Sequence, residues 1–128
     1  MMRALLLAAF VSALAFSTDA QAQSAQIGGK FGYLGEYELS ADVVAQQIDG
    51  KTDFTGSMTV KHVGLCTHSG PDQSDGRIVV QLNNRTSRVA VTLLFDGQQC
   101  SYSGRLSQSD VGELTCSGSS VPFSIWLK

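Results

Sequence analysis

The chain has 128 residues, of which 43% are hydrophobic, and it carries nine Lys or Arg against eleven Asp or Glu, for a formal net charge of −2. A chain of this length favours a single domain. The near balance of charge argues against nucleic acid or an anionic membrane as the main partner.

Residues 1–22 predict a cleaved secretory signal peptide. Arg3 supplies a positive charge, residues 4–16 are apolar, and Ala-Gln-Ala at 20–22 provides small residues at a cleavage site. The apolar stretch is shorter than the roughly 20 residues of a spanning helix, so we expect no membrane span. The leader is typical of bacteria. We therefore expect a periplasmic or secreted protein whose single β-barrel-like domain comprises residues 23–128.

The first part of that domain predicts one long hairpin. Gln23–Gly29 is small and polar and is expected to be loose, whereas apolar residues alternate from Tyr37 to Ala45, with Phe31–Leu34 as a lead-in. Asp49-Gly50 then predicts a type I′ turn. Centring the hairpin on this turn pairs Ala45 with Phe54, Ala41 with Met58, Leu39 with Val60 and Tyr37 with His62. Since a one-residue slip would reverse every side chain, the match of apolar partners supports this register.

The segment Val63–Gly76 has no periodicity and predicts a long loop of functional or mobile character. Alternation resumes after it, and Asp96-Gly97 predicts a further tight turn. The remaining strands are expected near 78–82, 89–95, 100–106, 112–116 and 121–127. A final turn at Ser117–Ser120 would set Cys116 opposite Val121 and Leu114 opposite Phe123.

The fold class predicted from this pattern is all-β: a small antiparallel up-and-down meander of seven to eight strands. We expect a closed or nearly closed barrel, because closure removes edges that would otherwise invite aggregation. A two-sheet β-sandwich is the alternative.

Three cysteines in an oxidising compartment predict one disulfide and one leftover thiol. Cys100 and Cys116 share strand parity on neighbouring strands. Their bond would close a loop of about 16 residues, worth roughly 3 kcal/mol in the chain-entropy model. Cys66 is then an odd thiol beside His68, predicted to be reactive, so the protein is expected as a monomer or a Cys66-linked dimer. Alternatively, Cys66 turns inward as an inert apolar residue.

The meander brings several chemically distinctive side chains to one end of the barrel. The ligand-binding candidates there are Tyr37, His62, Cys66, His68 and Phe95. The alternative is purely structural, with a satisfied histidine capping the core. Cys66-Thr67-His68 lacks the usual spacing of zinc ligands, and oxidation competes for the thiol, so we predict no metal site and no cofactor.

The positions predicted to face inward hold no carboxylate, histidine or lysine, the groups that general acid–base catalysis would need in a cleft. We therefore predict a non-catalytic binding module for a small apolar ligand or a protein partner. The alternatives are an interaction protein, for example an inhibitor acting on a hydrolase through its outer face, and, third, an enzyme. An interior filled by Phe54, Met58, Tyr102 and Phe123 would favour the interaction protein.

Arg85, Arg88 and Arg105 are predicted to lie together at the end of the barrel opposite the cysteines. They could steer an acidic partner, although arginines scattered among serines more often serve solubility.

Overall fold

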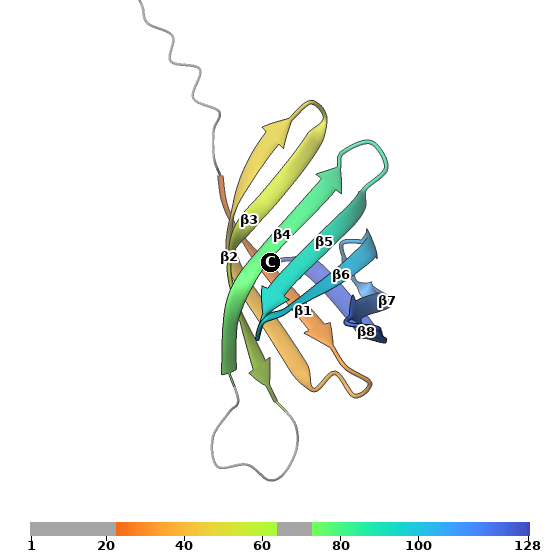
Figure 1. The fold of residues 1–128 in the computed structure, drawn as a ribbon. Helices are drawn as coiled ribbons and strands as arrows, with labels where there is room; N and C mark the ends of the chain where they lie inside the picture. Colours follow the sequence, from red (N-terminus) through yellow and green to blue (C-terminus); the bar gives the residue numbers. More distant parts are fainter. Residues whose placement is uncertain (1–22, 64–72) are drawn as a thin grey trace, which may run out of the picture.

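The computed structural model describes residues 23–63 and 73–128, which form eight antiparallel strands closed into an up-and-down barrel (Figure 1). The predicted closed barrel is confirmed over the sandwich. The strands are β1 (Gln23–Phe31), β2 (Tyr37–Ile48), β3 (Lys51–His62), β4 (Gln73–Asn83), β5 (Arg88–Phe95), β6 (Gln98–Arg105), β7 (Ser107–Cys116) and β8 (Ser119–Leu127). Within these residues, no helix is long and apolar enough to cross a membrane.

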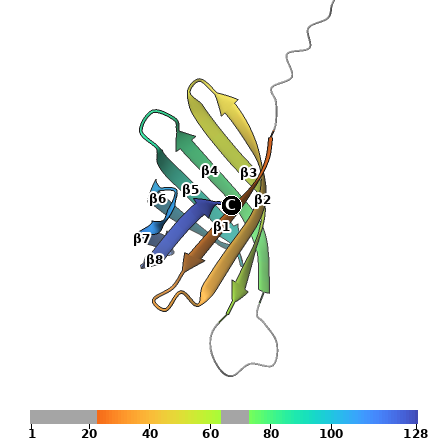
Figure 2. The same cartoon turned by 180° about the vertical axis from the view of Figure 1, so that it is seen from behind.

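The barrel closes where β1 pairs with β8, with Ile27 opposite Leu127 and Phe31 opposite Phe123 (Figure 2). The expectation that Gln23–Gly29 is loose was therefore wrong. Ile27 and Phe31 point into the core, but the intervening Gly29 lacks an apolar side chain, so the alternation is weak in the sequence. Pairing with both β2 and β8 orders this segment in spite of its polar composition.

Three two-residue turns connect strands, and in each both residues have positive φ, as a type I′ turn requires. They are Asp49-Gly50 (φ 48° and 76°), Asp96-Gly97 (50° and 70°) and Ser117-Gly118 (46° and 89°). The first fixes the β2–β3 register, in which all four predicted pairs are present.

Two predicted boundaries need correction. The last turn comprises Ser117-Gly118 alone, so Cys116 faces Ser119 and Leu114 faces Val121, two residues away from the predicted partners. A shift of two residues preserves strand parity, which is why the apolar pattern did not exclude it. The predicted loop Val63–Gly76 is also shorter, because β4 begins at Gln73 and its first residues pair with the end of β3.

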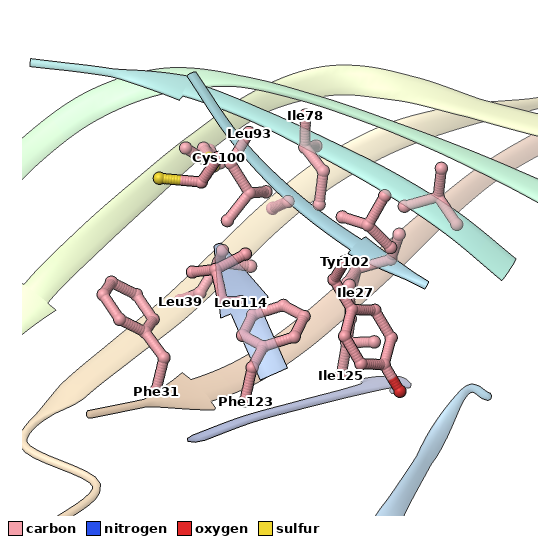
Figure 3. Packing of buried hydrophobic residues seen from close by; sticks show 14 of the residues in the cluster. Ile27, Phe31, Leu39, Ile78, Leu93, Cys100, Tyr102, Leu114, Phe123 and Ile125 are labelled. Atoms are coloured by element: carbon pink, nitrogen blue, oxygen red, sulfur yellow. The ribbon is translucent and has the colours of Figure 1, made fainter. Parts of the chain in front are cut away.

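The interior of the barrel is filled by side chains (Figure 3). Phe54, Met58, Tyr102 and Phe123 are only 5%, 2%, 4% and 1% exposed, and the Tyr102 and Phe123 rings meet edge to face with centroids 4.9 Å apart. Leu82, Phe95 and Leu106, at the ends of the predicted strands 78–82, 89–95 and 100–106, are partly buried rather than fully enclosed. The middle of the barrel is therefore packed like an ordinary protein core. An open depression of about 470 Å³ lies at the mouth away from the disulfide, lined in part by Ala25, Ala45 and Phe54.

The β6–β7 seam is the weakest part of the wall, since only Cys100–Cys116 and Ser101–Thr115 are paired across it. Beyond these pairs the Tyr102 side chain fills the seam. Its hydroxyl donates to the Arg105 carbonyl oxygen and accepts from the Arg105 N–H, both at 3.1 Å. A Cβ at Gly104 or Gly112 would overlap the Tyr102 ring, so both positions need glycine for this close approach.

Candidate binding site at the cysteine end

The disulfide marks one end of the barrel, called here the cysteine end, where the β1–β2, β5–β6 and β7–β8 connections lie, together with the end of β3 and the start of β4. Cys100 and Cys116 are directly opposite each other on β6 and β7, with Cα atoms 4.3 Å apart, and their predicted disulfide is present. This bond is compatible with an oxidising compartment outside the cytoplasm.

An aromatic cluster occupies the same end. Phe31 stacks on Tyr37 with ring centroids 4.8 Å apart and an interplanar angle of 8°, because the two residues are paired on β1 and β2. The ring centroids of Tyr37 and His62, its partner on β3, are 5.0 Å apart. The ring centroid of Phe31 also lies 6.1 Å from that of Phe95 and 6.4 Å from that of Phe123. The cluster joins the buried core to the rim.

An open depression of about 460 Å³ lies beside this cluster. Its lining residues are Tyr37, Val60, His62, Gln73, Ser74, Phe95 and Asp96. The Ser74 hydroxyl donates to the Asp96 carboxylate at 3.0 Å on the polar side of the depression. Tyr37, Val60 and Phe95 give the depression apolar surface beside four polar residues, so it suits a partner group that has both an apolar face and a hydrogen-bonding edge.

Three of the five sequence-predicted candidates, Tyr37, His62 and Phe95, are thus brought together in one depression. Cys66 and His68 lie outside the described residues. Phe31 was assigned only to a lead-in segment, although it is central to the aromatic cluster. Its alternation with Ile27 is the sequence signal that could have placed it on an inward face.

The β1–β2 loop presents two large apolar side chains that sequence reasoning did not single out. Tyr33 and Leu34 are 77% and 93% exposed. They stand between Gly32 and Gly35, whose φ values of 104° and 63° turn the backbone sharply. A Gly-x-x-Gly spacing between two aromatic residues was the available signal for such a turn.

Hydrogen bonds hold this loop on the rim. The Gly35 N–H donates to the Gly32 carbonyl at 3.2 Å, and the Leu34 N–H donates to the Glu36 carboxylate at 2.8 Å. The Tyr33 hydroxyl reaches the Ser120 carbonyl oxygen on β8 at 3.2 Å. The exposed side chains therefore project from an ordered backbone tied to a distant strand.

Among residues 23–63 and 73–128, no group of three or more His, Cys, Asp or Glu side chains is arranged to hold a metal ion. No family model, no curated protein and no solved structure matches the chain.

Proposed function

We propose that the protein is an exported, non-catalytic binding module that holds a protein partner at its cysteine end. The observation that carries this proposal is the pair Tyr33 and Leu34, 77% and 93% exposed on a hydrogen-bonded loop that joins two members of the aromatic cluster. Tyrosine is enriched among the residues that dominate the energy of protein interfaces, and Leu34 adds exposed apolar area beside it. Because the backbone that carries them is already ordered, binding loses less conformational entropy.

The packing of the barrel supports a partner on the rim rather than a ligand inside it. The middle of the barrel is filled by aromatic and aliphatic side chains, whereas the depression lined by Tyr37, His62 and Phe95 lies on the surface formed by residues 23–63 and 73–128. An apolar side chain from a protein loop could rest in this depression while Tyr33 and Leu34 contact the surface around it. The disulfide supports the export that the leader predicts.

A small apolar ligand in the same depression is the second candidate. Its volume of about 460 Å³ is within the range of small-molecule sites. Such a ligand would contact Tyr37 and Phe95 and would leave Tyr33 and Leu34 without a role.

Photo-crosslinking in the producing cells tests the proposal. A photoreactive phenylalanine replaces Leu34 in one variant and, as a matched control, Val111 in another; Val111 is 68% exposed and belongs to β7 rather than to the loop. We expect a discrete protein adduct at position 34 and none at position 111. With the captured partner purified, Leu34→Ser should weaken binding by roughly tenfold or more without lowering the midpoint of thermal unfolding.

Two outcomes would contradict the proposal. An adduct at position 111 with none at position 34 would indicate that the partner binds the outer face of the barrel, as the inhibitor alternative predicts. Absence of any adduct together with a co-purified small molecule in native mass spectrometry would favour the small-ligand candidate.

A further inference from the structure

Basic side chains gather at the end of the barrel opposite the cysteines, called here the arginine end. Arg88 on β5 and Arg105 on β6 are directly opposite each other in the ladder, and both are exposed. Neighbouring strands lie about 5 Å apart, so the two side chains start from adjacent positions on the outer face. Like charges in this arrangement destabilise a sheet.

No carboxylate on the outer face of these two strands relieves the repulsion. The outward positions are Arg88, Ala90, Thr92 and Leu94 on β5, and Gln99, Ser101, Ser103 and Arg105 on β6. On the β4 side the nearest outward residues are the uncharged Gln81 and Asn83. The acidic residues of this end are on other strands: Asp49 and Asp53 belong to the β2–β3 hairpin, and Asp110 belongs to β7.

Two further cations flank the arginine pair. Lys51 is paired with Asn83 across β3 and β4, and Arg85 lies in the β4–β5 turn. The Asn84 N–H in this turn donates to the Gly50 carbonyl at 3.1 Å, and the Thr52 hydroxyl donates to the Asn84 side chain at 3.0 Å. The turn that carries Arg85 is therefore fastened to the hairpin that carries Lys51.

A local side chain also fixes the backbone of each arginine. The Arg85 N–H donates to the Asn83 carboxamide oxygen at 3.0 Å, and the Arg88 N–H donates to the Thr86 hydroxyl at 3.4 Å. The Arg105 N–H donates to the Tyr102 hydroxyl at 3.1 Å. Ligand binding would then need to order only the arginine side chains, which reduces its entropic cost.

We propose that Arg88 and Arg105 form a binding site for a phosphate group, with Arg85 and Lys51 adding flanking positive charge. The planar guanidinium presents paired donors that match phosphate oxygens, and two such groups from adjacent strands can hold one phosphate between them. The anion would also remove the repulsion between the arginines. A soluble phosphate ester and a lipid headgroup share this chemistry. The site is separate from the proposed partner surface, which lies at the cysteine end.

The first test is an NMR titration of the isotopically labelled protein with sodium phosphate at constant ionic strength. We expect saturable shifts of the Arg88 and Arg105 amide signals. Arg88→Gln and Arg105→Gln should each lower the affinity by roughly tenfold, as expected for the loss of a charge-assisted hydrogen bond. Arg77→Gln is the matched control, since Arg77 is exposed on β4 nearer its other end and its removal changes the net charge equally.

The second test is cosedimentation with vesicles of phosphatidylglycerol and, separately, of phosphatidylcholine. Binding to phosphatidylglycerol vesicles that Arg105→Gln abolishes, without a response to inorganic phosphate, would assign the site to a lipid headgroup; the reverse would assign it to a soluble phosphate. The proposal is overturned if neither probe binds, or if Arg77→Gln weakens binding as much as Arg105→Gln does. Well-dispersed spectra of each variant verify that the barrel remains folded.

Discussion

Removal of the Cys100–Cys116 disulfide should weaken the barrel at one identifiable place. The β6–β7 ladder consists of two residue pairs, and one of them is the disulfide-bonded pair itself. The perturbation is the double variant Cys100→Ala, Cys116→Ala. It is made in a Cys66→Ser background, so that Cys66 can neither exchange with the Cys100–Cys116 disulfide in the control nor form a disulfide between chains in the variant.

The expected magnitude follows from the sequence separation of 16 residues between the two cysteines. Closing a loop of that length lowers the entropy of the unfolded chain by an amount worth about 3 kcal/mol at 25 °C. Small domains are stable by roughly 5–15 kcal/mol in total, so the loss should be large enough to measure and need not unfold the protein.

Urea unfolding monitored by tryptophan fluorescence gives the free energy of unfolding, with the Cys66→Ser protein as the control. Hydrogen exchange locates the effect. Relative to the control, exchange should accelerate more at the amides flanking the seam, at Ser103, Arg105 and Leu114, than at those of β2 and β3. A loss below about 1 kcal/mol, with unchanged exchange at the seam, would refute the reasoning. Packing of Tyr102 would then be the main element holding β6 and β7 together.

Three further substitutions have predicted effects that urea unfolding can measure. Tyr102→Phe should lower the free energy of unfolding by about 1–2 kcal/mol, because it removes both hydrogen bonds to the Arg105 backbone; no change would show that solvent replaces them. Gly112→Ala should cost about 1–3 kcal/mol, since the added methyl group overlaps the Tyr102 ring, and a neutral result would mean that the seam widens freely. Arg88→Gln should raise stability by roughly 0.2–1 kcal/mol by relieving repulsion from Arg105, and a loss of stability would indicate a favourable contact of Arg88 instead.

The β2–β3 hairpin shows why part of the fold was predictable. Asp49-Gly50 specifies the turn, apolar residues alternate from Tyr37 to Ala45 on β2, and Phe54, Met58 and Val60 on β3 have the matching parity. Turn chemistry and side-chain parity are independent signals, and here they agree on a single register. That register places Tyr37 opposite His62, so the prediction extended to two residues of the candidate site.

The β7–β8 hairpin shows where the same method is insensitive. Ser117–Ser120 contains several residues that can turn the chain, and a register change of two leaves each apolar side chain on its own face. The correct turn is selected by the pair Ser117-Gly118, which adopts positive φ, and by packing of Gly112 against Tyr102. The contact between Gly112 and Tyr102 joins β7 to β6, whose ladder has only two residue pairs, and no local sequence pattern encodes this contact.

The rim of the barrel was the hardest part to predict, and the proposed partner surface lies there. Alternation distinguishes inward from outward positions along a strand, but residues beyond a strand end belong to neither class. The exposure of Tyr33 and Leu34 depends on hydrogen bonds to distant segments, among them the bond from the Tyr33 hydroxyl to Ser120, 87 residues away. A Tyr-Leu pair between glycines is equally consistent with a loop folded onto the core. Closure of β1 against β8 brings Tyr33 beside Ser120 and leaves Leu34 in solvent. In this chain, the proposed partner surface can therefore be predicted only after barrel closure has been predicted.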